Sequence, residues 1–198
     1  MGTTHRFCAM DDHTADRLTL WTIGHSTRSS DEFLALLQEH AIRRLIDIRR
    51  YAGSRRYPHF HSDALNNTLT NAGLEYHQLV ELGGRRTARP DSPNRGWKNA
   101  GFRGYADYMS TEAFQQALHT LMTDAAASRT AIMCAEAVPW RCHRTLVADA
   151  LVIHGWQVVH ILGPGQIKRH ELTTFARVEG DLIVYPAPAG EEAPPRLF

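Results

Sequence analysis

Residues 130–162, TAIMCAEAVPWRCHRTLVADALVIHGWQVVHIL, decide the fold of this chain. They open with an almost wholly apolar run, 130–135, which is typical of a strand that a parallel sheet buries on both faces. The polar loop that follows leads into a helical pattern over residues 145–154, which Gly155 stops. Residues 156–162 form a second apolar run. This order predicts a parallel strand–helix–strand unit.

The same alternation extends towards both ends of the chain. Apolar runs predict further strands at 18–23 and 45–48, and repetition of the pattern predicts another at 74–79. Helical spacing predicts helices at 33–42, capped by Ser29, Ser30 or Asp31, at 63–72 and at 105–127. Residues 175–178 and 182–185 predict a hairpin, and 80–104 a long functional or disordered loop. We therefore expect an α/β fold of three layers, with a mostly parallel five-stranded sheet and a C-terminal hairpin.

Length and composition favour a single domain over residues 18–186. The chain has 198 residues, of which 43% are hydrophobic, and a domain of this size buries enough surface to fold without disulfides. Residues 1–17 are polar and unpatterned, so we expect a flexible or disordered arm there, and residues 187–198 form a Pro-rich tail.

The cysteine count and the absence of long apolar runs favour a cytoplasmic protein. Three cysteines, an odd number, fit a reducing compartment better than a disulfide framework. No apolar run approaches the roughly 20 residues of a membrane span, and the first residues lack the apolar core of a signal peptide. We expect no membrane partner.

The net charge of +1 averages two opposite regions. Residues 43–103 carry twelve Arg or Lys against five Asp or Glu, whereas the rest of the chain carries ten against sixteen. Of the 22 basic residues 20 are Arg, whose guanidinium group suits phosphate or carboxylate. A compositional preference for Arg explains the total but not the clustering, so we expect an anionic partner.

Polar groups follow four of the predicted strands. Because the carboxyl ends of parallel strands meet at one edge of a sheet, these groups are expected to converge on one crevice. They are His25 after the first strand; Asp47, Arg49, Arg55 and Arg56 after the second; Arg85 and Arg86 after the third; and Glu136, Cys142, His143 and Arg144 after the fourth.

The triplet Cys142-His143-Arg144 is the most specific of these features. It lies at the start of a predicted helix, where backbone N–H groups stabilise negative charge, so Cys142 is a candidate thiolate nucleophile. The alternative is a packed cysteine beside a surface arginine. A transition-metal site formed by Cys134, Cys142, His143 and His25 is a weaker alternative, since the usual paired ligand spacing is absent. The sequence requires no cofactor.

Three further residues are candidates for proton transfer. Glu136 is either a general acid or base or the partner of an arginine, and Asp47 is either an active-site carboxylate or an anchor that orients Arg49. His25 follows a strand in a Gly-His-Ser turn, which leaves its imidazole available for catalysis.

Aromatic residues alternate with the arginines of residues 49–105, and Tyr105 ends this stretch. Arginines for phosphate and aromatic rings for stacking are the ingredients of nucleotide or single-strand recognition. A solvated basic loop with aromatic residues in the core has the same sequence pattern.

Five ordered motifs resemble the family known as domain of unknown function 488. The motifs are Thr22-Ile23-Gly24-His25-Ser26; Asp47-Ile48-Arg49 with Gly53-Ser54-Arg55-Arg56; Glu81-Leu82-Gly83-Gly84-Arg85; Phe102-Arg103-Gly104-Tyr105; and Cys134-Ala135-Glu136 through Pro139 to Cys142-His143-Arg144. The resemblance runs from about Trp21 to Pro186. It implies a Rossmann-like α/β fold in a mostly prokaryotic, cytoplasmic family, and it carries over no established reaction.

Two functions of different classes remain after these observations. The leading one is an enzyme, a hydrolase or transferase, that acts on a phosphate-bearing or otherwise anionic substrate such as a nucleotide or nucleic acid. The alternative is a non-catalytic nucleic-acid-binding or accessory module, and a transition-metal-binding protein is the third option. The sequence does not indicate an oligomeric state.

Overall fold

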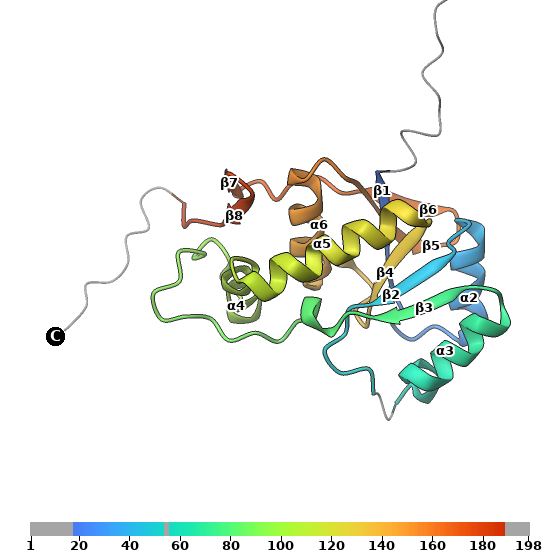
Figure 1. The fold of residues 1–198 in the computed structure, drawn as a ribbon. Coiled ribbons are helices and arrows are strands. Elements are labelled where there is room, and N and C mark those ends of the chain that lie inside the picture. Colours follow the sequence, from blue (N-terminus) through green and yellow to red (C-terminus); the bar gives the residue numbers. More distant parts are fainter. Residues whose placement is uncertain (1–17, 54–55, 189–198) are drawn as a thin grey trace, which may run out of the picture.

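A six-stranded sheet forms the middle layer of the fold (Figure 1). The computed structural model describes residues 18–53 and 56–188. The strands are β1 (Thr19–Gly24), β2 (Arg44–Asp47), β3 (Glu75–Gln78), β4 (Thr130–Cys134), β5 (Gln157–Gly163) and β6 (Gln166–Arg169). Their order is β3-β2-β4-β1-β5-β6, in which the first five are parallel and β6 is antiparallel to β5.

Helices cover both faces of this sheet. They are α2 (Ser30–Glu39), α3 (Ser62–Asn71), α4 (Ala100–Met109), α5 (Glu112–Ala127) and α6 (Arg144–Ile153). One apolar core packs α2 and α3 against one face of the sheet, and a second packs α4, α5 and α6 against the other. Alternate residues of one strand enter different cores, as Ala131 and Ile132 of β4 do. The three-layer α/β fold is therefore confirmed.

The number of strands in the main sheet differs from the expected five. A tight turn, in which Gly165 has a φ of 63°, connects β5 to the sixth strand, β6, and the two strands pair as antiparallel neighbours. All four of its residues are exposed. The sequence pattern missed β6 because an exposed edge strand has no alternation of buried and exposed side chains to reveal it. The expected C-terminal hairpin is present as β7 (Arg177–Glu179) and β8 (Leu182–Val184).

The single helix expected over residues 105–127 is two helices. The first, α4, begins at Ala100, inside the stretch expected to be an irregular loop, and Asn99 caps it by accepting from two backbone N–H groups. The chain then breaks at Ser110 and Thr111, whose hydroxyls donate to backbone carbonyls of the preceding turn. Thr111 also caps α5. Short hydroxyl side chains compete with the helix for backbone groups, which accounts for the break.

The strands β1 and β4 are neighbours in the sheet, but the chain leaves β1 towards one edge of the sheet, where β2 lies, and leaves β4 towards the other, where β5 lies. The helix after β1, α2, packs on one face, whereas the helix after β4, α6, packs on the other. A crevice forms at the carboxyl ends of strands at such a point. Gly24 ends β1 there, and a Cβ on it would lie 1.8 Å from the backbone oxygen of Glu136, so the two loops approach more closely than any side chain allows.

A buried carboxylate holds the long connection between β3 and α4 in place. Asp107 of α4 accepts hydrogen bonds from the backbone N–H of Arg89 at 2.8 Å, the Ser92 hydroxyl at 2.5 Å and the Asn94 amide at 2.9 Å. These residues belong to a stretch without regular helix or strand, so Asp107 supplies the order that secondary structure does not. The expected functional loop is thereby fixed at one edge of the sheet.

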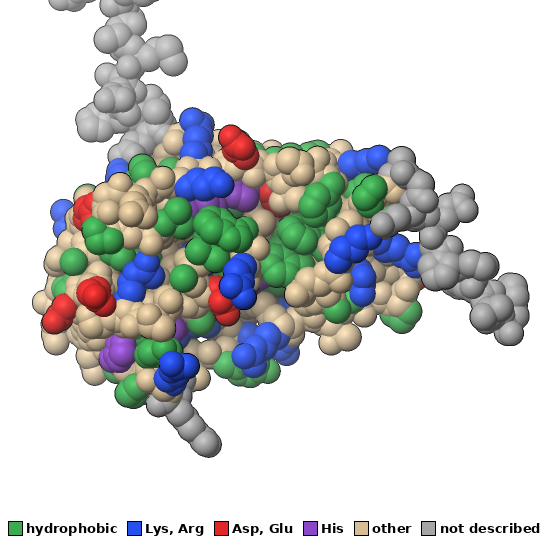
Figure 2. Space-filling model, turned by 180° about the vertical axis from the view of Figure 1, so that it is seen from behind, with side chains coloured by type: hydrophobic (Ala, Val, Ile, Leu, Met, Phe, Trp, Pro, Cys, Tyr) green, Lys and Arg blue, Asp and Glu red, His purple; other side chains and the backbone are tan. Residues whose placement is uncertain are grey.

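The two ends of the chain fall outside this description. The expected arm at 1–17 lies outside the described residues, as does most of the expected tail, from 189 to 198. Within the described part, no helix combines the length and apolar character needed to cross a membrane. On the face that Figure 2 presents, basic side chains stand in separate groups with acidic ones between them.

Candidate functional site

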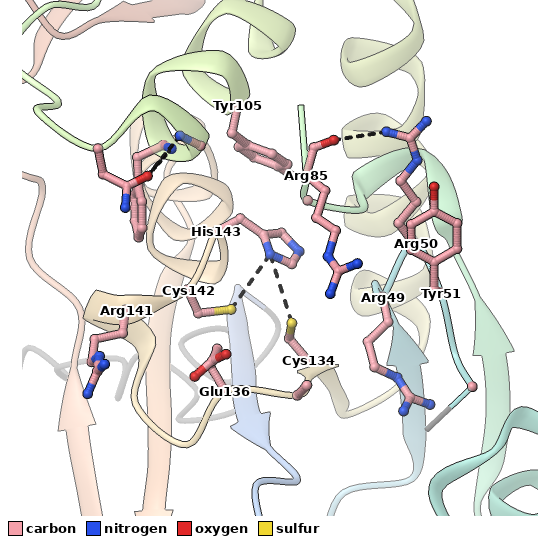
Figure 3. Close-up of a pocket in the computed structure, with 16 residues that line it drawn as sticks. Arg49, Arg50, Tyr51, Arg85, Tyr105, Cys134, Glu136, Arg141, Cys142 and His143 are labelled. Atoms are coloured by element: carbon pink, nitrogen blue, oxygen red, sulfur yellow. Dashed lines mark hydrogen bonds between the residues drawn. The ribbon is translucent and has the colours of Figure 1, made fainter. Parts of the chain in front are cut away.

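A pocket of about 400 Å³ lies beyond the carboxyl ends of β2 and β4 (Figure 3). Three loops of the chain line it, those that follow β2, β3 and β4, together with the start of α4. The lining residues are Arg49, Arg50, Tyr51, Gly53, Gly84, Arg85, Asn99, Gly101, Phe102, Tyr105, Cys134, Ala135, Glu136, Arg141, Cys142 and His143. The expected convergence of strand-end loops on one crevice is therefore found for three of the four loops.

Two cysteines and a histidine meet within the pocket. Cys134 ends β4, whereas Cys142 and His143 immediately precede α6. The Nδ1 atom of His143 lies 3.9 Å from the sulfur of Cys134 and 3.7 Å from the sulfur of Cys142. The three potential ligand atoms all lie within 4.8 Å of one another. We call these residues the sulfur–imidazole cluster.

The two thiols of this cluster have opposite acidities. Burial raises the pKa of Cys142, but the hydrogen bond from Cys134, the neighbouring His143 and the charge of Arg144 outweigh it and hold that pKa well below the usual range. The pKa of Cys134 lies well above its usual range because this thiol donates to Cys142 and is itself buried. Cys142 is thus the more acidic of the two thiols.

Backbone and ring contacts orient the imidazole of His143. Its Nε2 atom lies 3.3 Å from the backbone oxygen of Ile48, at the end of β2, and donates to it. The ring of Tyr105 packs against the imidazole at 5.1 Å between centroids. On the other side, a Cβ at Gly84 would lie 2.8 Å from Nδ1. Glycine at this position therefore leaves open space beside the nitrogen that faces the two sulfurs.

Four arginines line the pocket, and one of them is held rigidly. Arg49 is 5% exposed and makes a buried ion pair with Asp47 at 2.6 Å, and it also donates to the backbone oxygen of Phe60 at 2.8 Å. Tyr76 donates to the same carboxylate at 2.8 Å. Asp47 is wholly buried and does not line the pocket. Of its two expected roles, the structure places it as the anchor that orients Arg49.

The other three arginines, Arg50, Arg85 and Arg141, are exposed. Arg50 and Arg85 each have their guanidinium carbon 5.7 Å from the centre of the Tyr51 ring, and Arg50 also donates to the backbone oxygen of Arg85 at 3.0 Å. Within residues 18–53 and 56–188, no ion pair joins any of the three to an acidic side chain. Their positive charge is available to a bound anion.

Glu136 is the acidic residue of the pocket lining. It is exposed two residues beyond Cys134 and lines the same pocket as the two sulfurs (Figure 3). The pairing with an arginine, one of its two expected roles, does not occur among the described side chains. Its backbone oxygen instead accepts from Arg144 at 2.5 Å, which fixes the loop. Glu136 is therefore placed to exchange protons with a ligand in the pocket.

His25 lies outside the pocket. It is 3% exposed, its ring stacks on Phe60 at 4.2 Å, and its Nε2 atom lies 3.4 Å from Arg49. Burial and the charge of Arg49 lower the pKa of His25 to about 4. It is also not part of the sulfur–imidazole cluster, so the four-residue metal site considered from the sequence reduces to three residues. His25 follows the end of β1 near the pocket, but its side chain points into the core.

Three other arginines expected to bind substrate have contacts with backbone or aromatic groups of the protein. Arg144 is wholly buried and bonds to the backbone of the β4–α6 loop. Arg86 donates to the backbone oxygens of Gly83 and Glu81, and Arg56 lies over Tyr57. None of the three lines the pocket. Arg55 lies outside the described residues.

Several lining residues were not selected from the sequence as site residues, among them Arg50, Asn99 and Arg141. Arg50 stands beside Arg49, and the sequence could not indicate which of two adjacent arginines faces the pocket; here both do. Asn99 has a recognisable signal, since asparagine before a run of small residues is typical of a helix cap. It was missed because the start of the helix was expected at residue 105, five residues after the observed start of α4.

Comparison with known proteins yields one match. A family model described as "Domain of unknown function DUF488" matches residues 29–151. The matched range includes every residue of the pocket lining. The match confirms, over residues 29–151, the resemblance inferred from the motifs. No curated protein and no solved structure matches the sequence.

Proposed function

This chain belongs to the DUF488 family, and we propose that it is an enzyme that acts on a phosphate-bearing or otherwise anionic small molecule of about nucleotide size. The observation that carries the proposal is the placement of Arg50, Arg85 and Arg141, without acidic partners among the described residues, around a pocket that also holds the sulfur–imidazole cluster. Binding groups and reactive groups thus share one cavity.

The size of the pocket supports a small substrate. A volume of about 400 Å³ is typical of sites that enclose most of a small ligand. An extended nucleic acid needs a continuous basic groove, and on the face in Figure 2 the basic side chains stand apart from one another. The guanidinium carbons of Arg50 and Arg85 both lie 5.7 Å from the centre of the Tyr51 ring, so a planar ligand group would meet an aromatic side chain next to the guanidinium groups.

The roles of the lining residues follow from their surroundings. Arg49, fixed by Asp47, is a rigid contact for one end of the anion, whereas the more exposed Arg50 and Arg85 adjust to it. In the metal-free protein, Cys142 is the nucleophile that the cluster offers, because its sulfur lies 3.7 Å from the imidazole of His143. Glu136 is the group for proton transfer.

Titration of the full chain with pyrophosphate and with adenosine monophosphate, followed by calorimetry at low salt, tests the anion site. We expect both to bind, and the Arg50→Ala, Arg85→Ala double variant to bind at least about tenfold more weakly, because hydrogen bonds to charged groups contribute about 1.5–3 kcal/mol each. Arg169→Ala is the matched control, since Arg169 is an exposed arginine of β6 outside the pocket.

Two outcomes would overturn this proposal. One is binding that the double variant leaves unchanged. The other is salt-dependent binding of a single-stranded oligonucleotide without binding of either small anion, which would favour the nucleic-acid-binding module. If the anions bind, incubation with a panel of phosphate esters and detection of products by mass spectrometry identifies the substrate, and Cys142→Ala should abolish turnover while leaving anion binding in place.

A further inference from the structure

We propose that Cys134, Cys142 and His143 bind one Zn²⁺ ion whose fourth coordination position opens into the arginine-lined pocket. The zinc site itself is independent of the proposed function; only the anionic substrate on which the ion acts rests on it. Two thiols and one imidazole are a ligand set that Zn²⁺ takes in catalytic sites, where three protein ligands leave one position for water or substrate. The three side chains come from only two short segments, the end of β4 and the start of α6.

The distances within the sulfur–imidazole cluster match the edges of a zinc tetrahedron. Zn–S bonds of about 2.3 Å and a Zn–N bond of about 2.0–2.1 Å at tetrahedral angles give N···S edges of about 3.6 Å and an S···S edge of about 3.8 Å. The observed N···S distances are 3.7 Å and 3.9 Å, and the two sulfurs lie within 4.8 Å of each other. The sulfurs need to approach by at most about one ångström to hold the ion.

The orientation of His143 is a second, independent observation. Histidines that bind metals almost always donate their other ring N–H to a carboxylate, a backbone carbonyl or water, which fixes the tautomer. Here Nε2 donates to the backbone oxygen of Ile48 at 3.3 Å, so in the neutral ring the lone pair is on Nδ1 and points at the two sulfurs.

The space for the ion is a third observation. A Cβ at Gly84 would lie 2.8 Å from Nδ1 of His143, so the missing side chain leaves room beside the coordinating nitrogen. All three potential ligands line the pocket, and they are mostly buried rather than displayed on the surface. The site is thus open to a small ligand and otherwise enclosed by protein.

With the ion bound, the nucleophile is a water molecule rather than the Cys142 sulfur. Zinc lowers the pKa of a bound water to near 7, and zinc enzymes commonly carry a glutamate base next to a ligand in the chain. Glu136, two residues beyond Cys134, takes the proton from this water. The resulting hydroxide bonds to the electrophilic carbon or phosphorus of the substrate, the bond to the leaving group breaks, and Glu136 returns the proton to the leaving group. The reaction is a hydrolysis.

Metal content and Co²⁺ spectroscopy test the proposal without any substrate. The reduced full-length protein, purified without chelator, should contain about one Zn²⁺ per chain by elemental analysis. After removal of the zinc, Co²⁺ should produce the intense visible absorption of a four-coordinate ion and a sulfur-to-cobalt charge-transfer band in the near ultraviolet. Wild-type protein that contains no zinc and shows neither absorption overturns the proposal.

Ligand variants identify the site. Cys134→Ser, Cys142→Ser and His143→Gln should each weaken Co²⁺ binding at least about tenfold, and each single cysteine variant should lose about half of the charge-transfer intensity. The matched controls are Cys8→Ser, the third cysteine of the chain, and His119→Gln, an exposed histidine of α5; both should keep wild-type binding. Full Co²⁺ affinity in a folded His143→Gln variant, checked by circular dichroism, would overturn the proposed ligand set.

The same measurements separate this proposal from the proposed function. The Arg50→Ala, Arg85→Ala double variant should bind Co²⁺ like the wild type, because neither arginine belongs to the cluster. Anion binding without metal binding removes the zinc site and leaves the enzyme with Cys142 as its nucleophile. Metal binding without anion binding keeps the zinc site and removes the anionic substrate.

Discussion

A buried histidine makes the stability of this fold depend on pH. His160 lies in β5 and is 2% exposed. Its Nδ1 atom lies 2.7 Å from the hydroxyl of Thr22, and its Nε2 atom lies 3.0 Å from Nδ1 of His170. Burial, with the positive charge of His170 and other nearby cations, lowers the pKa of His160 to about 3. The imidazole therefore stays neutral in the folded protein at every pH at which the protein is commonly handled.

The size of the effect follows from the difference between the folded and unfolded chains. In the unfolded chain the pKa of a histidine is about 6.5. As the pH falls from 7 to 5, the unfolded state binds a proton at His160 and the folded state does not, so the unfolded state gains stability. Integration of the proton-binding difference over this window gives about 2 kcal/mol of lost folding free energy from this residue alone.

Urea unfolding at pH 7 and at pH 5 measures this contribution. The change in the free energy of unfolding between the two pH values should be about 2 kcal/mol smaller for His160→Gln than for the wild type, because glutamine does not titrate. Comparison of the two proteins cancels the titrating groups that do not interact with His160. His119→Gln is the control, since that side chain is exposed in the folded and unfolded chain alike. Equal pH dependence in His160→Gln and wild type would refute the assignment of a neutral, buried imidazole.

Three further substitutions test how the fold supports the pocket. Asp47→Asn should destabilise the protein by about 3–5 kcal/mol, because it leaves the buried guanidinium of Arg49 without its counter-charge. A denaturant titration measures the free energy of unfolding, and a decrease of less than about 1 kcal/mol would mean that the pair is solvated. Gly24→Ala places a Cβ 1.8 Å from a backbone oxygen and should cost about 3 kcal/mol or more, seen as a lower Tm, whereas an unchanged Tm would show that the two loops can separate. Asp107→Ala removes three hydrogen bonds from residues 83–99 and should make this loop the first site of limited proteolysis, while unaltered cleavage would assign its order to other contacts.

Four of the five parallel strands, β1, β2, β4 and β5, could be predicted because each contains an apolar run that stops at a turn or polar signal, whereas β3 is polar and mostly exposed. Parallel strands buried on both faces have no alternation to misread, and the helices between them follow from the spacing of apolar residues. The break at Ser110 and Thr111 could not be predicted in the same way. Apolar positions continue at helical spacing on both sides of it, and only the hydrogen bonds of the two hydroxyls reveal the interruption.

The site was predictable in its position but not in its orientation. The rule that ligands bind at the carboxyl ends of parallel strands placed Arg49, Glu136, Cys142 and His143 together, and the structure has all four in the pocket lining. The rule does not say which way a side chain turns after the strand ends. His25 also follows a strand end, yet it packs on an aromatic ring in the core, because its direction depends on tertiary packing that the sequence pattern does not carry.

The division of the pocket between two sources of side chains has a consequence for how such a protein can diversify. The sulfurs, the imidazole, Glu136 and Arg141 come from the end of β4 and the short connection to α6, whereas the other three arginines and the ring of Tyr51 come from loops after β2 and β3, and Phe102 from the start of α4. Insertions or substitutions in those two loops alter what is recognised without displacing the atoms that react. Relatives that share the connection but differ in residues 49–53 and 85–102 would then carry one reaction to different ligands, and exchanging these loops between two such relatives should exchange their preferences.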